Sequence, residues 1–144
     1  MDSRFENPAI GCACFNLRKA ARAITQRYDA HLQKCGLRST QFTILAALDS
    51  LGPQSLSALA DTLVLDRTTL TRNLKPLQRD GLIASHPGSD RRVRELKITA
   101  EGTSRLTEAM PLWHKAQSDM IGRLGPGTAS NLLNLLEETV QAIA

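Results

Sequence analysis

Two neighbouring segments of this 144-residue chain gather side chains that are suited to holding a polyanion. Their candidate residues are mostly cations and hydroxyl donors. Those in the first segment are Arg67, Thr68, Thr69, Thr71, Arg72, Lys75 and Arg79, and those in the second are Ser89, Asp90, Arg91, Arg92 and Arg94. Guanidinium and ammonium groups pair with phosphate oxygens, and together with hydroxyls they donate to base edges. These residue types therefore indicate noncovalent recognition of double-stranded DNA.

A helix is needed to place the first set of side chains on one surface. Leu70, Leu74 and Leu77 recur at four and three residues, which puts them on one apolar face. At about 100° per residue, the opposite face carries Thr68, Arg72, Lys75 and Arg79, with Arg67 and Thr71 toward one flank. Asp66 is placed to cap the N-terminus, and Leu65 can pack on Leu70 as a hydrophobic staple. A solvated surface helix has the same pattern, but this one also fits a DNA major groove.

The elements on either side of this helix favour the DNA interpretation. Before it, residues 56–63 repeat their apolar positions as a helix does, and the next two residues provide a tight turn. After it, residues 83–87 and 94–98 can pair as strands around a turn at residues 88–92. The adjacent guanidiniums at this turn suit a narrow minor groove, where negative potential attracts arginine. The order of elements predicts a helix-turn-helix followed by a basic hairpin.

The excess positive charge of the chain is confined to this region. The sequence has 18 Lys and Arg against 14 Asp and Glu, a net charge of +4. Residues 66–97 contain eight of the cations and four of the acids, so the remaining residues contain ten of each. Such a local surplus is the electrostatic footprint of a nucleic-acid-binding surface. It argues against the alternative of a module that binds a protein partner, which would present a neutral or apolar surface here.

The same region resembles the MarR family of winged-helix regulators. The resemblance rests on residues 66–72 with Leu74 and Leu77, on residues 81–83, and on residues 90–92 followed by Leu96, Ile98, Thr99 and Gly102. Because these motifs occur in the right order and the helices on both sides match too, the resemblance covers nearly the whole chain. It implies a mainly α fold with a small β-hairpin wing. It also implies a homodimeric regulator, expected to repress at a pseudo-palindromic operator and to be released by an effector. We predict no cofactor.

The resemblance and the hydrophobic pattern together predict one domain with two roles. We expect residues 1–144 to form a single domain, with residues 37–99 as the DNA-binding region and residues 10–35 and 100–144 as dimerisation helices. A regular apolar stripe from Ile10 to Cys35 predicts one long first helix. The first and last helices have more apolar face than one chain can cover. A second copy of the chain is therefore the expected partner.

Several local features refine the predicted helices. Ser39 or Thr40 is expected to cap the second helix. Pro76 removes a backbone donor inside the DNA-reading helix, which predicts a bend or an early loosening there. Thr99 is expected to cap a helix of about twenty residues that Pro111 kinks, by the same backbone argument.

The N-terminal helix carries a second resemblance. Cys14 with the Phe-Asn-Leu that follows it, and Tyr28 fourteen residues on, is similar to the organic-hydroperoxide-sensing branch of the same family. The resemblance implies that Cys14 is oxidised to a sulfenic acid, that Tyr28 contacts it and that DNA is then released. Arg18 and Ser39 stand where that branch has two further tyrosines. Arg18, one turn along, would lower the pKa of the Cys14 thiol if it turned inward.

Two other roles for Cys14 stay open. A cysteine within an apolar stripe commonly packs as a small hydrophobe. Cys12 and Cys14 also form a Cys-x-Cys pair, but on a helix two such side chains point about 200° apart, so one chain could not clamp a metal with them. We therefore predict no metal site within one chain. The rival effector to oxidation is a small apolar or aromatic anion bound between the dimerisation and DNA-binding parts.

Enzymatic activity has little support in the sequence. His31, His86 and His114 are scattered, and no phosphate-binding glycine loop or zinc-ligand spacing occurs. A thiol enzyme with Cys14 as nucleophile would lack a histidine base. No apolar run is long enough to span a membrane. No signal peptide is recognisable, and an odd number of cysteines suggests reduced thiols, so a cytoplasmic protein is expected.

Overall fold

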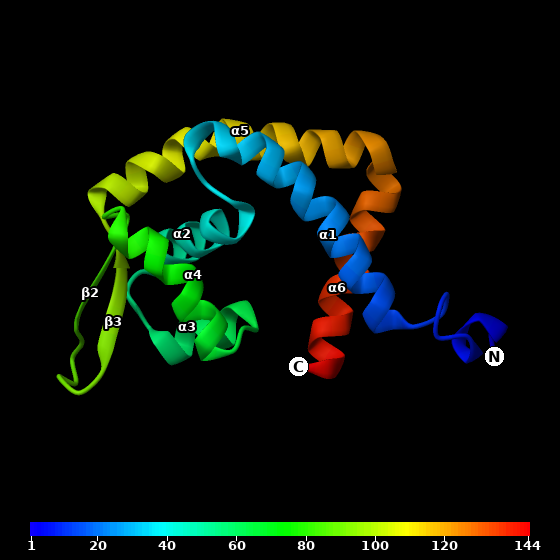
Figure 1. Ribbon diagram of the computed structural model, residues 1–144, viewed down its shortest axis with the longest axis horizontal. Helices are drawn as coiled ribbons and strands as arrows, with labels where there is room; N and C mark the ends of the chain where they lie inside the picture. The colour runs from blue at the N-terminus through cyan, green and yellow to red at the C-terminus, as the bar shows by residue number, and fades with distance from the viewer.

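The computed structural model describes residues 1–144. Its elements, in chain order, are η1 (Ser3–Glu6), α1 (Ala13–Leu32), η2 (Gln33–Cys35), α2 (Ser39–Leu51), β1 (Gln54–Ser55), α3 (Leu56–Leu63), α4 (Arg67–Arg79), β2 (Ile83–Pro87), β3 (Arg94–Ile98), α5 (Ala100–Leu124) and α6 (Pro126–Ile143). The molecule has the shape of an arch (Figure 1). Helix α5 forms its top, α2, α3, α4 and the β-hairpin form one side, and α6 with the N-terminal half of α1 forms the other. The predicted mainly α fold with a β-hairpin wing is confirmed.

The core lies beneath α4, on the side of the arch that carries the hairpin. Leu70, Leu74 and Leu77 are at most 3% exposed and pack in one cluster with Leu45 and Leu59 of the neighbouring helices. Burying each leucine contributes roughly 1.5–3 kcal/mol, so these contacts fix α4 firmly on the domain. The apolar underside of α4 predicted from its leucine spacing is therefore confirmed, and its polar side faces outward.

The sheet has one strand more than the sequence predicted. β2 and β3 pair antiparallel, from Ile83 opposite Ile98 to Pro87 opposite Arg94, within the predicted bounds. β1 adds on the other edge of β3, with Gln54 opposite Leu96. A strand of two residues has no alternating pattern, so only its pairing with β3 defines it. The third strand ties the start of α3 to the base of the wing.

The first turn of α5 is locked onto the base of this hairpin. The Thr99 hydroxyl donates to the carbonyl of Gly81 at 2.6 Å and accepts from the N–H of Gly102 at 3.0 Å, which makes Thr99 the predicted N-cap. Gly102 lies so close to the chain just before β2 that a Cβ atom on it would be 2.1 Å from the carbonyl oxygen of Leu82. The direction of α5 is thus fixed relative to the wing.

Helix α1 packs along the far part of α5 through polar contacts. Asp119 accepts from Arg123 at 2.9 Å and from Arg27 at 3.3 Å, and the Arg123 hydrogen bond is the main reason that the pKa of the Asp119 carboxyl is lowered. The Tyr28 hydroxyl donates to the side chain of Gln117, and burial raises the pKa of that hydroxyl. These contacts hold α1 against α5, the top of the arch.

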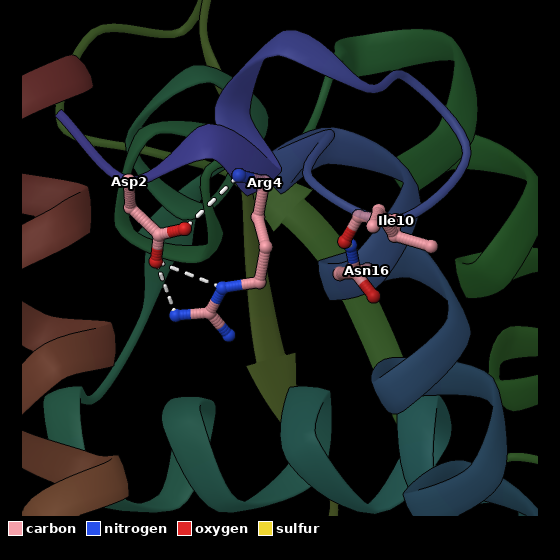
Figure 2. A network of polar contacts seen from close by, with 4 residues as sticks. All are labelled: Asp2, Arg4, Ile10 and Asn16. Carbon is pink, nitrogen blue, oxygen red and sulfur yellow. Dashed lines mark hydrogen bonds and ion pairs between the residues drawn. The ribbon is translucent and has the colours of Figure 1, made fainter.

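The predicted start of the first helix at Ile10 is wrong, because α1 begins at Ala13. Residues 1–11 fold back into a compact turn in which Asp2 pairs with Arg4 and the Asn16 amide donates to the carbonyl of Ile10 at 3.0 Å (Figure 2). Gly11 packs so closely that a Cβ atom on it would clash with the carbonyl oxygen of Arg4. Ile10 is therefore exposed, outside the apolar stripe.

Two further predictions about helix ends are corrected. Neither Ser39 nor Thr40 caps α2, because Arg38 is the N-cap and Ser39 is already helical. The N–H of Ser39 donates instead to Asp29 of α1 at 2.7 Å. Pro76 does not loosen α4, which continues to Arg79. The N–H of Asp80 donates to the carbonyl of Pro76 at 3.0 Å and closes the last turn.

The two ends of the chain leave large apolar side chains in solvent. On α6 these are Leu133, Leu135, Leu136, Val140 and Ile143, and near the start of α1 they are Phe15 and Leu17. Both helices lie on the side of the arch away from the wing (Figure 1). None of the helices combines the length and the hydrophobicity that crossing a membrane requires.

Candidate nucleic-acid interface

Helices α3 and α4 form the predicted helix-turn-helix, and both begin with a side-chain cap. The Ser55 hydroxyl accepts from the N–H of Ala58 at 3.1 Å, and Asp66 caps α4 as predicted. Between them Val64 has φ of 52°, in the left-handed region that β-branched residues rarely adopt. The turn is therefore tight enough to present the first turn of α4 to solvent.

The outer side of α4 lines an open cavity of about 500 Å³. Its lining residues on α4 all come from the predicted set: Arg67, Thr68, Thr71, Arg72 and Lys75. Leu56 of α3 closes one end, and no acidic side chain takes part. Three cations and two hydroxyls thus converge around one space on the N-terminal half of a helix. Base edges in a major groove require this combination of donors.

Thr69 belongs to the cap of α4 instead of this surface. Its N–H donates to Asp66 at 2.8 Å and its hydroxyl donates to the same carboxylate at 2.5 Å. These two hydrogen bonds, the hydroxyl one foremost, hold the pKa of the Asp66 carboxyl below its usual range. Thr69 is thereby committed to orienting the start of α4, which leaves Thr68 and Thr71 as the free hydroxyls.

The tip of the wing holds its guanidiniums in the open. Asp90 accepts from the backbone N–H of Arg92 at 3.0 Å and pairs with its Nε at 3.3 Å, and the backbone bond is the main cause of the lowered pKa of Asp90. The Arg92 side chain is nevertheless 90% exposed. Ser89 and Arg91 are also exposed. The Arg92 guanidinium thus bonds Asp90 through both Nε and its terminal Nη2 while it stays open to solvent, and an arginine oriented in this way is suited to enter a groove.

Arg94 and Arg79 lie neither in the cavity on the outer side of α4 nor at the tip of the wing. The Arg94 guanidinium turns back along the hairpin and donates to the carbonyl of Ser85 at 2.8 Å. Arg79 lines a second cavity, beside the first turn of α2, together with Arg38 and Gln41. The sequence analysis did not include Arg38 or Gln41, because only the packing of α2 against α4 places them next to the DNA-reading helix. A basic residue just before a predicted helix was the available signal.

Cys12 and Cys14 do not both lie within α1. Cys12 is the N-cap of α1, and its Sγ accepts from the N–H of Phe15 at 3.4 Å, while Cys14 is helical and exposed. Tyr28 contacts Gln117 instead of Cys14. Fourteen residues of helix separate Tyr28 from Cys14 by about 21 Å, so the implied contact cannot form within one chain. Arg18 is exposed and in no ion pair.

Comparison with known proteins decides what kind of DNA-binding fold this is. The family model described as MarR family matches residues 37–93. The Bacillus subtilis HTH-type transcriptional regulator MhqR is 33% identical over 104 residues, which cover 72% of this chain and 71% of MhqR. The chain belongs to the MarR family. It is a winged-helix DNA-binding transcriptional regulator.

Solved structures of this family share the whole fold. The crystal structure of the M. tuberculosis transcriptional regulator MosR in complex with DNA has 36% sequence identity and a TM-score of 0.78, covering 92% of this chain and 99% of that one. A mutant of E. coli MarR in complex with operator DNA has a TM-score of 0.81 at 19% identity, covering 96% of this chain and 99% of that one, and shows the common fold. The N- and C-terminal helices of the present chain are thus part of the MarR fold.

Proposed function

We propose that this MarR-family regulator is a homodimeric repressor that binds a pseudo-palindromic operator. Each protomer places α4 in a major groove and the wing in an adjacent minor groove. The observation that carries this proposal is the cavity on α4, where Arg67, Arg72 and Lys75 converge with two hydroxyls and without an acid. The assignment of the wing rests on the exposed guanidinium of Arg92.

The exposed apolar faces of α1 and α6 support the dimer. Leu133 and Leu135 of α6 are each about half exposed, and Phe15 and Leu17 of α1 are similarly open. A second copy of the chain would bury these faces, as apolar patches of this kind mark association sites. In this proposal residues 37–99 read DNA, and residues 10–35 and 100–144 form the dimer. Two-fold symmetry then sets half-sites about one helical turn apart.

Thiol oxidation is our first candidate for the release of DNA. Cys14 is exposed near the start of α1, so an oxidant in solution reaches its sulfur. Cys14 also borders the apolar face assigned to the dimer. Conversion to a sulfenic acid there adds a polar group where the proposed interface is apolar, which supports coupling between oxidation and DNA affinity.

A small ligand is the second candidate, favoured by a separate observation. An apolar groove of about 440 Å³ lies between α2 and α5, lined mainly by Phe42, Ala46, Ala47, Met110 and Trp113. The rings of Phe42 and Trp113 stack with centroids 6.1 Å apart. A flat aromatic molecule matches this lining, and the groove lies between the DNA-reading side and α5.

The family of this chain consists of transcriptional regulators, which are not enzymes. We propose that the chain likewise has no catalytic activity and acts in the cytoplasm on double-stranded DNA. A salt titration of duplex binding tests the proposal. The logarithm of the association constant should fall linearly with the logarithm of the salt concentration. The slope should be about −0.9 for each phosphate contacted. Binding that is absent at low salt, or that ignores salt, would favour a protein partner for this surface instead.

A further inference from the structure

A second cationic cavity lies on the flank of α4 that faces α2. Its volume is about 450 Å³. Six polar residues line it, from the first turn of α2 and from α4: Arg38, Thr40, Gln41, Arg72, Asn73 and Arg79. Pro76 completes the wall, and there is no acidic residue in the lining. Three guanidiniums from two different helices therefore surround one space.

The cations of this cavity are largely unpaired within the chain. Arg38 and Arg72 take part in no ion pair. Arg79 pairs with Asp80 at 3.2 Å, but both side chains are more than half exposed, so the pair is screened by water and contributes little. An anion that enters the cavity thus meets cations with little competition.

The start of α2 adds backbone donors to these cations. Arg38 is the N-cap, and its side chain has only donors, so it cannot accept from the first turn of the helix. Its own N–H donates to Gln41 Oε1 at 3.0 Å, and the N–H of Ser39 donates to Asp29. The N–H groups of Thr40 and Gln41 remain to donate to a ligand at the positive end of the helix dipole.

Arg72 connects this cavity with the DNA-facing one, since it lines both. We propose that the α2–α4 cavity holds a backbone phosphodiester of the DNA strand that borders the major groove read by α4. The inference rests on the placement of α4 in that groove. A phosphate beside a recognition helix fixes the register of the protein on the duplex without reading sequence. Arg38 and Gln41 are then positioning residues of the interface.

The first test compares Arg38→Gln with Arg22→Gln, which removes an exposed arginine from the middle of α1, away from both cavities. Each protein is titrated with a duplex selected for tight binding from a random pool and with an unrelated duplex. Arg38→Gln should weaken binding to both duplexes by a similar factor of about ten and lower the salt slope by about 0.9 per half-site. Arg22→Gln should match the wild type, because Arg22 is exposed and lies outside the apolar stripe of α1 that is assigned to the dimer. Equal affinities for Arg38→Gln and wild type, or a loss limited to the selected duplex, would overturn the proposal.

The second test locates the phosphate. The selected duplex is made with single methylphosphonate linkages, each of which removes one backbone charge. At the contacted position the methylphosphonate should weaken binding by the wild type. It should not weaken binding by Arg38→Gln any further, because that variant already lacks the partner of this phosphate, as expected for a double-mutant cycle. Additive losses at every position would refute the contact. Arg79→Gln repeats the scan if the circular dichroism of Arg38→Gln shows that it is unfolded.

A small anion is the competing occupant. If millimolar inorganic phosphate, at constant ionic strength, displaces the duplex from wild type but not from Arg38→Gln, and no single methylphosphonate linkage weakens wild-type binding, the cavity is an effector site and the proposal fails. If no variant and no wild-type protein binds either duplex, the proposed function fails instead. The outcomes are therefore distinguishable.

Discussion

The Asp66 carboxylate accepts two hydrogen bonds from Thr69, one from its backbone N–H at 2.8 Å and one from its hydroxyl at 2.5 Å. Both bonds favour the ionised carboxylate, so the pKa of Asp66 is lower in the folded protein than in the unfolded chain. The cap of the DNA-reading helix therefore depends on pH.

We expect Asp66→Ala to lower the thermal midpoint, and the difference from wild type to depend on pH. Because folding lowers this pKa, the stabilisation is fully present above the unfolded value of about 3.9 and is lost as pH falls through the folded value. Thermal melts from pH 7 down to acid conditions measure this. Ser55→Ala, which removes the non-titrating cap of α3, should destabilise by an amount that does not change with pH. A pH-independent loss for Asp66→Ala as well would contradict the prediction.

Gly102→Ala should destabilise the protein by roughly 1–3 kcal/mol, as overpacking of a close contact does. The added Cβ would lie 2.1 Å from the carbonyl oxygen of Leu82 and force α5 away from the wing. Gly122→Ala in the same helix is the matched control, since nothing lies within 4 Å of its added Cβ. That change should stabilise by about 0.4–1 kcal/mol. Chemical denaturation measures the free energy of unfolding of both variants. Equal effects on it would show that the close contact at Gly102 does not determine stability.

Arg92→Ala should weaken operator binding by about 1–3 kcal/mol and leave the thermal midpoint unchanged. The side chain is 90% exposed, so it has few contacts in the free protein to lose. Fluorescence anisotropy with a labelled duplex measures the affinity, and Lys115→Ala, an exposed change on α5, is the control. Tight binding by Arg92→Ala at moderate salt would exclude the wing from the interface.

The apolar face of α6 leads to a prediction about assembly. The intact chain should sediment as a dimer at micromolar concentration, and deletion of residues 128–144 should yield aggregated or unfolded protein. Leu136→Glu, which places a charge on the apolar face, should shift the dimer toward monomer. Asn134→Glu on the opposite side of α6 should not. A stable monomer of the intact chain would reject the dimer.

Oxidation at Cys14 is tested with organic hydroperoxide. At low micromolar oxidant the wild type should release its duplex and regain it with reductant, because the exposed sulfur of Cys14 is accessible to the oxidant. Cys14→Ser should bind DNA and ignore the oxidant, whereas Cys12→Ser and Cys35→Ser should respond as wild type does. Equal responses of wild type and Cys14→Ser would leave the apolar groove at Phe42 and Trp113 as the effector site.

The features predicted correctly from the sequence are those set by neighbours in the chain. The leucine spacing of α4, its cap at Asp66 and the bounds of β2 and β3 all follow from local periodicity and turn chemistry. The failures involve partners distant in sequence or backbone packing. Ile10 leaves the helix because Gly11 packs on Arg4, and β1 exists only because Gln54 pairs with β3.

The candidate site follows the same rule. The cations of the N-terminal half of α4 share a face because they share a helix, so their convergence was predictable. The position of Arg38 beside Arg72 depends on how α2 crosses α4, which no periodicity encodes. The orientation of Arg94 toward Ser85 likewise depends on the strand pairing.

The 25 residues of α5 form one continuous helix that contains Pro111, about 37 Å along its axis at 1.5 Å per residue. One end is locked to the wing through Thr99 and Gly102, and the other continues into α6. This helix therefore connects the wing to the far side of the arch, and we expect it to transmit motion between them as a lever arm. Rotation by about 5° at its α6 end displaces the wing by about 3 Å, close to the 3.4 Å step between base pairs. A small rotation at the α6 end of α5 is thus enough to move the wing by about one base-pair step along the DNA.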